Sequence, residues 1–418
     1  MEYLEIEKSF IDGMVFISGA KNIALPLIYA SLLSKGVHIY ENVPDIVDIR
    51  ITLQILNQLN VKTKFKNNVL EIDTSEFKFS GLPFELIKKL RASYYLLGVL
   101  IPQINKLSFT YPGGCSFQER PIDYHLDGFK KVGVKIIENN DVLSFDNTSL
   151  KAGVVILPKP SVGATINLLF TMVQIKGKSE IVNPSFDFEV KEVIKYLNKI
   201  GHLIEIEENK LIVYGGCSTP IKHFIPYDRV EVSTFALIGA AINRLLILGV
   251  DDNSINSLLS FFDGMNVKYE YHDNALFVEK SPLNKDVKLT LSVDPYINTD
   301  LGPLLCAFLL QNKKISIIED TIYPSRNKYV EELKKIGANI EVVNNKIIIF
   351  PNSKFKESVM VGKDLRGTMS LLIASLISGE KQKVFGLEYL ERGYEDIINK
   401  LKKINTKIRR KEQWKKLY

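Results

Sequence analysis

Six cationic residues stand either at the start of an apolar run or in a short polar stretch between predicted elements. They are Lys21, Arg91, Arg120, Arg326, Arg366 and Arg392. The start of a helix offers free backbone N–H groups, and an arginine fork matches the geometry of a phosphate or a carboxylate. Taken singly, each arginine is more readily explained by a surface ion pair. Because they recur at equivalent places along the chain, we expect them to bind a small ligand that carries both kinds of anionic group.

A cysteine that could do chemistry lies in the segment Tyr111–Ser116. Two glycines precede Cys115, and they predict a mobile stem that presents the thiol instead of burying it. Arg120, five residues further on, would hold a phosphate close to this thiol. Cys306 lies among apolar residues as a structural cysteine does, whereas Cys217 also follows two glycines, so local context alone does not decide. Since there is no Cys-x-x-Cys pair, we expect neither a disulfide framework nor a zinc site.

A single carboxylate, Asp300, begins an apolar helix after Asn298 and Thr299. One interpretation is a helix cap. The other is a base that takes a proton from a substrate hydroxyl. Among the five histidines, only His125 lies near the Cys115 segment, and their spacing is not that of metal ligands. We therefore expect no metal and no cofactor.

The elements that must position these side chains repeat along the chain. Polar stretches that precede apolar runs occur at Ser18–Asn22, Arg91–Ser93, Ser161–Thr165, Glu231–Phe235, Asn298–Gly302 and Asp364–Thr368. Their spacing of roughly 65 to 75 residues is longer than that of solenoid repeats. Residues that tolerate a left-handed helix end follow in each case, at Asn60, Gly133, Gly201, Asn266, Gly337 and Asn405. We expect six repeats, each a strand, a helix, a strand, a second helix and a β-hairpin.

The apolar patterns say which helices are buried. The first helix of each repeat is apolar nearly all round, whereas the second is amphipathic, as in Val190–Ile200. Strands are predicted at Met14–Ile17, Val37–Tyr40, Val154–Leu157, Leu211–Tyr214, Lys314–Ile318 and Lys346–Phe350. Three repeats could close around a bundle of buried helices with sheets outside, which predicts an α/β fold.

The length of 418 residues favours two domains of three repeats each. No long linker interrupts the chain, so we expect it to cross between domains at repeat junctions, near Ala20–Lys21 and near Tyr227–Val230. One domain would be residues 21–228. The other would be discontinuous, formed by residues 1–20 plus 229–418, and would carry Asp300, Arg326, Arg366 and Arg392.

The composition, 46% hydrophobic and 24% charged, is that of an ordinary globular protein. The apolar runs are shorter than the roughly 18 residues that a membrane span needs, and Met1–Ile11 does not resemble a signal peptide. We expect a cytoplasmic protein without a membrane partner. A net charge of +6 does not require nucleic acid. A clamp-like ring that encircles nucleic acid would need Lys and Arg along the buried helices. Here these residues stand at the helix starts, which disfavours that class of protein.

Several motifs are distinctive in combination. They are Ile17–Pro26, Pro112–Cys115, Arg120–Asp123 with His125, Ser161–Thr165, Thr299–Asp300, Asp364–Arg366 and Arg392–Tyr394. Together they resemble the enolpyruvyl transferase family. The resemblance extends from about Val15 to Lys402. It implies two inside-out α/β barrels, each with pseudo-threefold symmetry, that close over the substrates.

The reaction implied by the resemblance joins phosphoenolpyruvate to the sugar hydroxyl of UDP-N-acetylglucosamine and expels phosphate, by addition to a tetrahedral ketal followed by elimination. The resemblance assigns proton delivery to Cys115 and hydroxyl activation to Asp300. It places Lys21, Arg120 and Arg392 at the phosphate, Arg326 and Arg366 nearer the carboxylate, and Asn22 and Arg91 at both substrates. Cys115, Asp300, Lys21 and Arg392 are the implied catalytic residues.

The implied nucleotide-sugar residues are Asn22, Arg91, Arg120, Pro121, Ile122, Asp123, Tyr124, His125, Lys159, Ser161, Val162, Gly163, Asp300 and Ile322. The chain departs from the family pattern at Phe186–Glu189, Glu231–Thr234 and Pro324–Ser325, and these departures bear on sugar specificity. The alternatives are an enolpyruvyl transferase for another nucleotide or for shikimate 3-phosphate, and a silent paralogue that senses a nucleotide sugar. The partners expected are small molecules, and the protein is expected to be a monomer.

Overall fold

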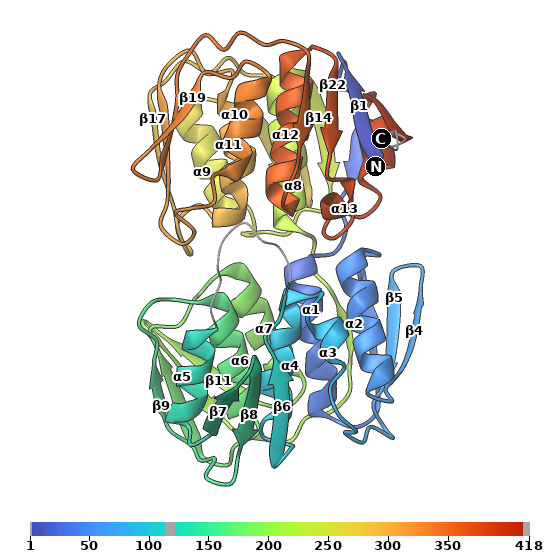
Figure 1. The fold of residues 1–418 in the computed structure, drawn as a ribbon, viewed down its shortest axis with the longest axis vertical. Coiled ribbons are helices and arrows are strands. Elements are labelled where there is room, and N and C mark those ends of the chain that lie inside the picture. Colours follow the sequence, from blue (N-terminus) through green and yellow to red (C-terminus); the bar gives the residue numbers. More distant parts are fainter. Residues whose placement is uncertain (1, 114–121, 413–418) are drawn as a thin grey trace. The chain divides into compact units, whose positions relative to one another are not determined.

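The computed structural model describes residues 2–113 and 122–412, which form a mixed α/β fold in two compact units (Figure 1). The inserted unit consists of residues 19–113 and 122–226, and the terminal unit consists of residues 2–18 and 227–412. Each unit has its own hydrophobic core. None of the helices in the described ranges is long and apolar enough to cross a membrane.

The inserted unit combines buried helices with several β-sheets. Its described sheets have the orders β13-β3-β5-β4, β6-β8-β7 and β11-β12-β10-β9. The strands are β3 (Val37–Glu41), β4 (Lys62–Lys66), β5 (Val69–Asp73), β6 (Lys106–Thr110), β7 (Lys135–Asn139), β8 (Val142–Asp146), β9 (Val154–Ile156), β10 (Lys178–Val182), β11 (Leu203–Glu207), β12 (Lys210–Tyr214) and β13 (Lys222–Phe224). The helices are α1 (Lys21–Ala30), η1 (Ser31–Leu33), α2 (Val47–Gln58), α3 (Phe84–Ile87), η2 (Arg91–Tyr94), α4 (Tyr95–Leu100), α5 (Asp123–Lys131), α6 (Val162–Met172) and α7 (Phe188–Lys199).

The terminal unit also combines buried helices with sheets, and its described sheets have the orders β15-β16-β14-β2, β17-β18-β20-β19 and β21-β22-β1-β23. The strands are β1 (Glu2–Glu7), β2 (Met14–Phe16), β14 (Arg244–Leu248), β15 (Lys268–His272), β16 (Ala275–Glu279), β17 (Val287–Leu291), β18 (Ser316–Asp320), β19 (Ile340–Val343), β20 (Lys346–Ile349), β21 (Ser358–Val361), β22 (Gln382–Phe385) and β23 (Lys407–Glu412). The helices are α8 (Arg229–Ile242), α9 (Asn256–Met265), η3 (Thr299–Leu301), α10 (Gly302–Leu309), α11 (Lys328–Lys335), α12 (Leu365–Ser378), α13 (Leu387–Leu390) and α14 (Ile397–Lys403).

The predicted helix ends are confirmed by the backbone. All six Gly or Asn positions have positive φ, namely Asn60, Gly133, Gly201, Asn266, Gly337 and Asn405. The first helices α1, α4, α6, α8, α10 and α12 are buried almost throughout, as their composition predicts. Two of them, α4 and α10, are preceded by the short 3₁₀ helices η2 and η3.

Two expectations about the repeats are wrong. No strand opens the second repeat among the described residues, because Phe77 and Phe79 pack against the core from an irregular segment that Gly81 (φ +120°) and Pro83 interrupt. The last repeat does not close with a local hairpin either. Instead β1 from the start of the chain lies between β22 and β23, antiparallel to both.

The chain passes between the units through two short segments. In the terminal unit Asp228 N donates to Ser18 O over 2.9 Å, and in the inserted unit Ala20 N donates to Pro226 O over 2.7 Å. Between Ser18 and Ala20, a Cβ on Gly19 would lie 1.7 Å from Asn42 O, so no larger residue fits there. The two segments are therefore hydrogen-bonded to each other within each of the two units.

A half-buried histidine on β13, His223, gives the fold a dependence on pH. The ring of His223 packs edge-on against Tyr196 with centroids 5.1 Å apart. Both ring nitrogens are buried and have no hydrogen-bond partner in the described part of the chain. Burial, assisted by the charge of Lys199, lowers the pKa of His223 to about 4.

The unfolded chain, with a histidine pKa of about 6.5, therefore binds more protons than the folded protein below that pH. We expect the contribution of His223 to the free energy of unfolding to be level above pH 6.5 and to fall between pH 6.5 and 4, by about 3 kcal/mol at most. His223→Phe should make this part of a urea-denaturation series measured against pH less steep, although the lowered pKa values of His38, His125 and His202 keep some slope, whereas His272→Phe, at an exposed side chain, should leave it unchanged. An unchanged slope in His223→Phe would contradict the assignment.

Candidate active site

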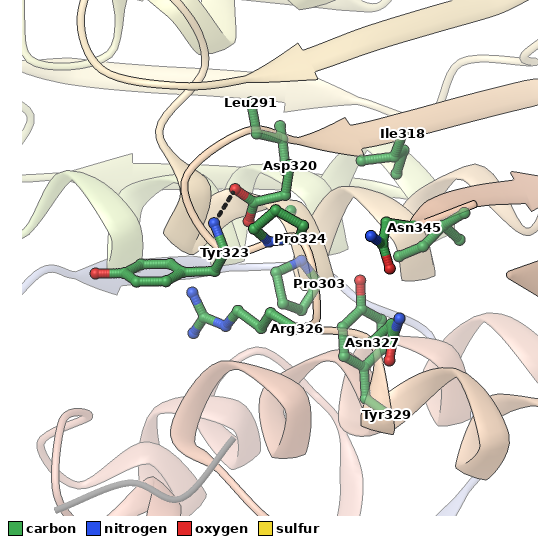
Figure 2. A pocket seen from close by; sticks show the side chains of 12 residues that line it. Leu291, Pro303, Ile318, Asp320, Tyr323, Pro324, Arg326, Asn327, Tyr329 and Asn345 are labelled. Atoms are coloured by element: carbon green, nitrogen blue, oxygen red, sulfur yellow. Dashed lines mark hydrogen bonds between the residues drawn. The ribbon is translucent and has the colours of Figure 1, made fainter. Parts of the chain in front are cut away.

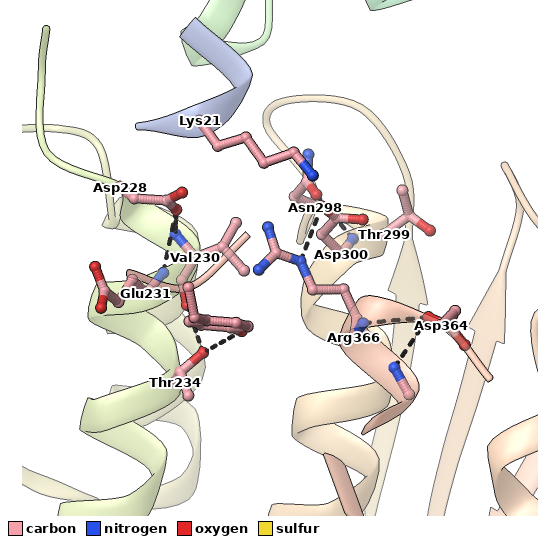
Figure 3. Close-up of polar contacts among 12 residues, drawn as sticks. Lys21, Asp228, Val230, Glu231, Thr234, Asn298, Thr299, Asp300, Asp364 and Arg366 are labelled. Carbon is pink, nitrogen blue, oxygen red and sulfur yellow. Dashed lines mark hydrogen bonds and ion pairs between the residues drawn. The ribbon is translucent and has the colours of Figure 1, made fainter. Parts of the chain in front are cut away.

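Asp300 is the centre of a charged cluster in the terminal unit. Asn298 caps η3, because its Oδ1 accepts the backbone N–H of Asp300 over 2.8 Å. The Asp300 side chain therefore has another role. It forms ion pairs with Arg326 (Nη1 to Oδ1, 2.9 Å) and with Arg366 (Nε to Oδ2, 3.2 Å), the latter visible in Figure 3. The interpretation of Asp300 as a helix cap is wrong.

The burial of this cluster is uneven. The side chains of Arg326 and Arg366 are 4% and 2% exposed, whereas that of Asp300 is 25% exposed. A carboxylate held by two buried guanidinium groups, and still open to solvent, can receive a ligand on its open side. The cluster thus provides one solvent-accessible carboxylate, which can act as an acid or a base, next to two fixed positive charges.

The loop after β18 positions Arg326 (Figure 2). Asp320, at the end of that strand, accepts the backbone N–H groups of Ile322 and Tyr323 over 2.9 and 2.8 Å and also the hydroxyl of Thr299. Arg326 N then donates to Tyr323 O over 2.9 Å. The loop and η3 are thereby joined through one carboxylate. Ile322, an expected sugar contact, lies half-buried in this loop.

Arg366 is the second residue of α12, which Asp364 caps by accepting Arg366 N and Gly367 N (Figure 3). Its guanidinium lies 5.2 Å from the ring centroid of Tyr394, whose hydroxyl is 2.9 Å from Thr234 Oγ1. Burial opposes the charge, yet Tyr394 and Asp300 raise the pKa of Arg366 above its ordinary value. Nη1 of Arg366 is buried and has no hydrogen-bond partner in the described residues. A buried unpaired donor costs about 1–3 kcal/mol, so an anionic ligand there would restore a lost bond.

Arg392 lies in the same unit, in the turn between α13 and α14, and is half-buried. Its backbone N–H donates to Tyr389 O over 3.3 Å. Tyr394, which supports Arg366, follows two residues later. The turn that carries Arg392 therefore also contributes to the Asp300 cluster.

In the inserted unit, Lys21 is the first residue of α1 and forms an ion pair with Asp48, with Nζ 2.7 Å from Oδ2. Asp48 is in the first turn of α2 and is almost fully buried. The pair holds the ammonium group at the start of a helix, where an anion would also be favoured by the helix dipole. Asn22 follows in the same turn and is half-buried.

A second cluster in the inserted unit, which we call the His125 cluster, consists of Arg91, Tyr94, His125, Gly163 and Asn167. The Arg91 guanidinium lies 5.6 Å from the Tyr94 ring centroid, and the Tyr94 and His125 rings are 4.8 Å apart. A Cβ on Gly163 would lie 2.7 Å from Tyr94 Oη, so a larger residue there would displace the Tyr94 ring. Burial, followed by the charge of Arg91, lowers the pKa of His125 to about 3.

The remaining expected nucleotide residues lie around this cluster. Ser161 caps α6 by accepting Ala164 N over 3.4 Å, and Val162 and Gly163 begin that helix. Ile122 is buried directly before α5, while Asp123 is exposed and Tyr124 half-buried in its first turn. Lys159 is exposed between β9 and α6. Cys115, Arg120 and Pro121 lie outside the described residues.

The structure thus brings Asp300, Arg326 and Arg366 into direct contact, and it groups Arg91 with His125 and the start of α6. Within the described ranges, no group of three or more His, Cys, Asp or Glu side chains could hold a metal ion. Sequence reasoning missed several residues that support the expected site residues, namely Asp48 beside Lys21, Tyr94 and Asn167 in the His125 cluster, and Asp320 near Arg326. A signal existed for one of them, because Asn167 interrupts an otherwise largely apolar helix.

Comparison with known proteins agrees with this architecture. Residues 7–401 match the family model described as EPSP synthase (3-phosphoshikimate 1-carboxyvinyltransferase). Among curated proteins, UDP-N-acetylglucosamine 1-carboxyvinyltransferase of Thermotoga maritima is 32% identical over 403 residues, which cover 95% of this chain and 96% of the relative. UDP-N-acetylglucosamine 1-carboxyvinyltransferase 2 of Staphylococcus aureus (strain MRSA252) is 33% identical over 402 residues, with coverage of 95% and 96%.

Solved structures share the fold. The enolpyruvyl transferase NikO from Streptomyces tendae has a TM-score of 0.90 at 19% identity and covers 99% of both chains. EPSP synthase from Acinetobacter baumannii has a TM-score of 0.78 at 16% identity, over 99% of this chain and 100% of the other. At these identities the likeness concerns the fold alone.

Proposed function

Because the chain belongs to the EPSP synthase family of enolpyruvyl transferases, we propose that it transfers the enolpyruvyl group of phosphoenolpyruvate to the sugar 3-hydroxyl of UDP-N-acetylglucosamine and releases phosphate. Relatives named UDP-N-acetylglucosamine 1-carboxyvinyltransferase match 95% of the chain at 32–33% identity. The observation that carries the proposal is the partly exposed carboxylate of Asp300, which is paired with the buried Arg326 and Arg366. Addition of a hydroxyl to an anionic substrate needs a base next to fixed positive charge.

The proposed reaction has two steps. In the addition, the sugar oxygen bonds to C2 of phosphoenolpyruvate, Asp300 accepts the hydroxyl proton, and Cys115 delivers a proton to the methylene carbon C3. The product is a tetrahedral ketal. In the elimination, C3 loses a proton, the C2–C3 double bond re-forms, and the C2–O bond to phosphate breaks. The transition states carry several negative charges, so preorganised cations supply much of the stabilisation.

We assign each charged or polar group of the two substrates to a set of residues. Arg326 and Arg366 bind the carboxylate, and the unpaired Nη1 of Arg366 supports this assignment. Lys21, Arg120 and Arg392 bind the phosphate. The His125 cluster, with Asn22, Arg120–Tyr124, Lys159 and the Ser161–Gly163 start of α6, binds the nucleotide sugar, while Asp300 and Ile322 contact its sugar ring. The start of α6 suits a diphosphate because the helix dipole favours an anion there.

We also propose the finer architecture that the family implies. Each unit would be an inside-out α/β barrel of three repeats, one spanning residues 21–228 and the other residues 1–20 plus 229–418. The buried helices α1, α4 and α6 in one unit, and α8, α10 and α12 in the other, support this view. A role in peptidoglycan synthesis, and so in cell shape and division, follows from the proposed reaction. A cytoplasmic location and a monomeric state stay predictions.

The proposal is tested by phosphate release. The purified protein is incubated with phosphoenolpyruvate and, separately, UDP-N-acetylglucosamine, shikimate 3-phosphate or uridine 5′-monophosphate, with acceptor-free samples as the blank. We expect release with UDP-N-acetylglucosamine, and the product should be heavier than the acceptor by one enolpyruvyl group. Release with another acceptor alone would indicate a different transferase, and binding of the nucleotide sugar without release would indicate a silent paralogue.

Arg366→Lys tests the carboxylate assignment. Lysine keeps the charge but loses the fork and the Nη1 donor, so we expect KM for phosphoenolpyruvate to rise by about 10- to 100-fold. Steady-state kinetics would measure this, with Arg244→Lys as the matched control, since Arg244 is an exposed arginine paired with Asp12 in the same unit. A lower melting temperature with unchanged KM would mean that Arg366 is structural only.

A further inference from the structure

Asn167 occupies a closely fitted niche between two buried helices. It is fully buried in α6, and Gly98 of α4 approaches it so closely that a Cβ on Gly98 would lie 2.4 Å from Asn167 O and 2.6 Å from Asn167 Oδ1. Thr171, one turn further along α6, donates to Gly98 O over 3.1 Å. The glycine therefore allows the amide of Asn167 to reach the backbone of the neighbouring helix.

Two backbone groups determine which way this amide points. Gly98 N–H can only donate, and it donates to Oδ1 over 3.0 Å. Tyr94 C=O can only accept, and it accepts from Nδ2 over 3.1 Å. A flipped amide would set donor against donor and acceptor against acceptor. The orientation of Asn167 is thus dictated by the chemistry of its partners.

The second N–H of the amide faces His125, with Nδ2 2.7 Å from Nδ1. Because Nδ2 donates, Nδ1 must accept, and the ring hydrogen must be on Nε2. A proton on Nδ1 would oppose the amide N–H. Burial and the nearby charge of Arg91 act in the same direction, since both disfavour the imidazolium form.

We propose that Asn167 is a positioning residue for nucleotide binding: it holds His125 as the neutral Nε2–H tautomer, so that Nε2 donates to an oxygen of the diphosphate. His125 Cε1, the atom between the two ring nitrogens, lies 3.1 Å from where a Cβ on Gly163 would stand, which puts the ring at the start of α6. The identity of the ligand rests on the proposed function, whereas the tautomer does not.

The tautomer is measurable in the unmodified protein. ¹⁵N-histidine labelling, with His125→Gln to assign the resonance, distinguishes a bare ring nitrogen from a protonated one. We expect bare Nδ1 and protonated Nε2, with no titration between pH 8 and 5. A hydrogen on Nδ1 would overturn the proposal, whatever the enzyme's acceptor is.

Asn167→Ala provides the second test, with Asn147→Ala as the matched control. Asn147 also donates to two backbone carbonyls of the inserted unit, those of Ile101 and Pro102. In Asn167→Ala we expect a fraction of the His125 rings to carry hydrogen on Nδ1, although Arg91 and Tyr94, the charged and titratable side chains beside the ring, are retained.

The same variants are titrated with uridine 5′-diphosphate by calorimetry. Loss of an oriented donor should weaken binding by roughly five- to tenfold in Asn167→Ala and by less than about twofold in Asn147→Ala. If both variants lose only thermal stability, while the ring spectrum and the affinity stay unchanged, Asn167 is structural and the proposal fails. If the unmodified protein does not bind uridine 5′-diphosphate, the nucleotide function fails instead, and the ring spectrum still decides the tautomer.

Discussion

Replacing Asp300 with asparagine is expected to lower turnover by roughly 10²- to 10⁴-fold, the usual contribution of a positioned base. The amide has nearly the shape of the carboxylate but does not take up the proton of the sugar hydroxyl. The ion pairs with Arg326 and Arg366 are lost as well. Asp364, 3.6 Å from Arg326, remains as a counter-charge, so we expect the variant to fold with a reduced melting temperature.

The measurement must separate chemistry from stability. Phosphate release is followed at a temperature where circular dichroism shows the variant to be folded, and binding of UDP-N-acetylglucosamine is measured alongside. Asp12→Asn is the matched control, because Asp12 is an acid of the same unit that pairs with an arginine at the surface. If Asp300→Asn turns over like the control and only melts earlier, Asp300 is a structural counter-ion and not the base.

Replacing Cys115 with serine is expected to reduce turnover by orders of magnitude while the nucleotide sugar still binds. A serine hydroxyl neither ionises near neutral pH nor offers a proton as readily as a thiol does. Phosphate release and calorimetric binding of UDP-N-acetylglucosamine together measure the two effects. Turnover equal to that of the unmodified protein would remove Cys115 from the mechanism.

Covalent labelling tests the same thiol independently. A small epoxide phosphonate of the fosfomycin type should alkylate Cys115 selectively, because the cations at the phosphate site guide it there. The two other cysteines are internal controls: Cys217 is exposed, whereas Cys306 is buried and burial raises its pKa to about 12. Peptide mass spectrometry that found Cys217 labelled to the same extent as Cys115 would contradict guided reaction.

Local features of the chain were predictable because their causes are local. Asn60, Gly133 and Asn266 end helices in the left-handed region because their own backbones tolerate it. The buried helices are recognisable because an apolar surface all round leaves no face for water. The opening strand that we expected for the second repeat is absent from the described residues, where Gly81 and Pro83 interrupt the segment. This signal was also local, but the expectation followed the repeat pattern instead.

Pairing across long stretches of chain was decided by the tertiary structure alone. Asp300 meets Arg326 across 26 residues and Arg366 across 66, and nothing next to Asp300 in the sequence distinguishes this role from that of a cap. Likewise β1 completes the last sheet from the opposite end of the chain.

The same division holds in the His125 cluster. The amide in an apolar helix was visible in the sequence, but its partners Tyr94 and His125 lie 73 and 42 residues away. Sequence by itself determined the helices, their ends and the presence of cations at their starts, because these depend on neighbouring residues. Only the fold decided which charges and amides meet, since hydrogen bonds and ion pairs act over a few ångströms in space and not along the chain.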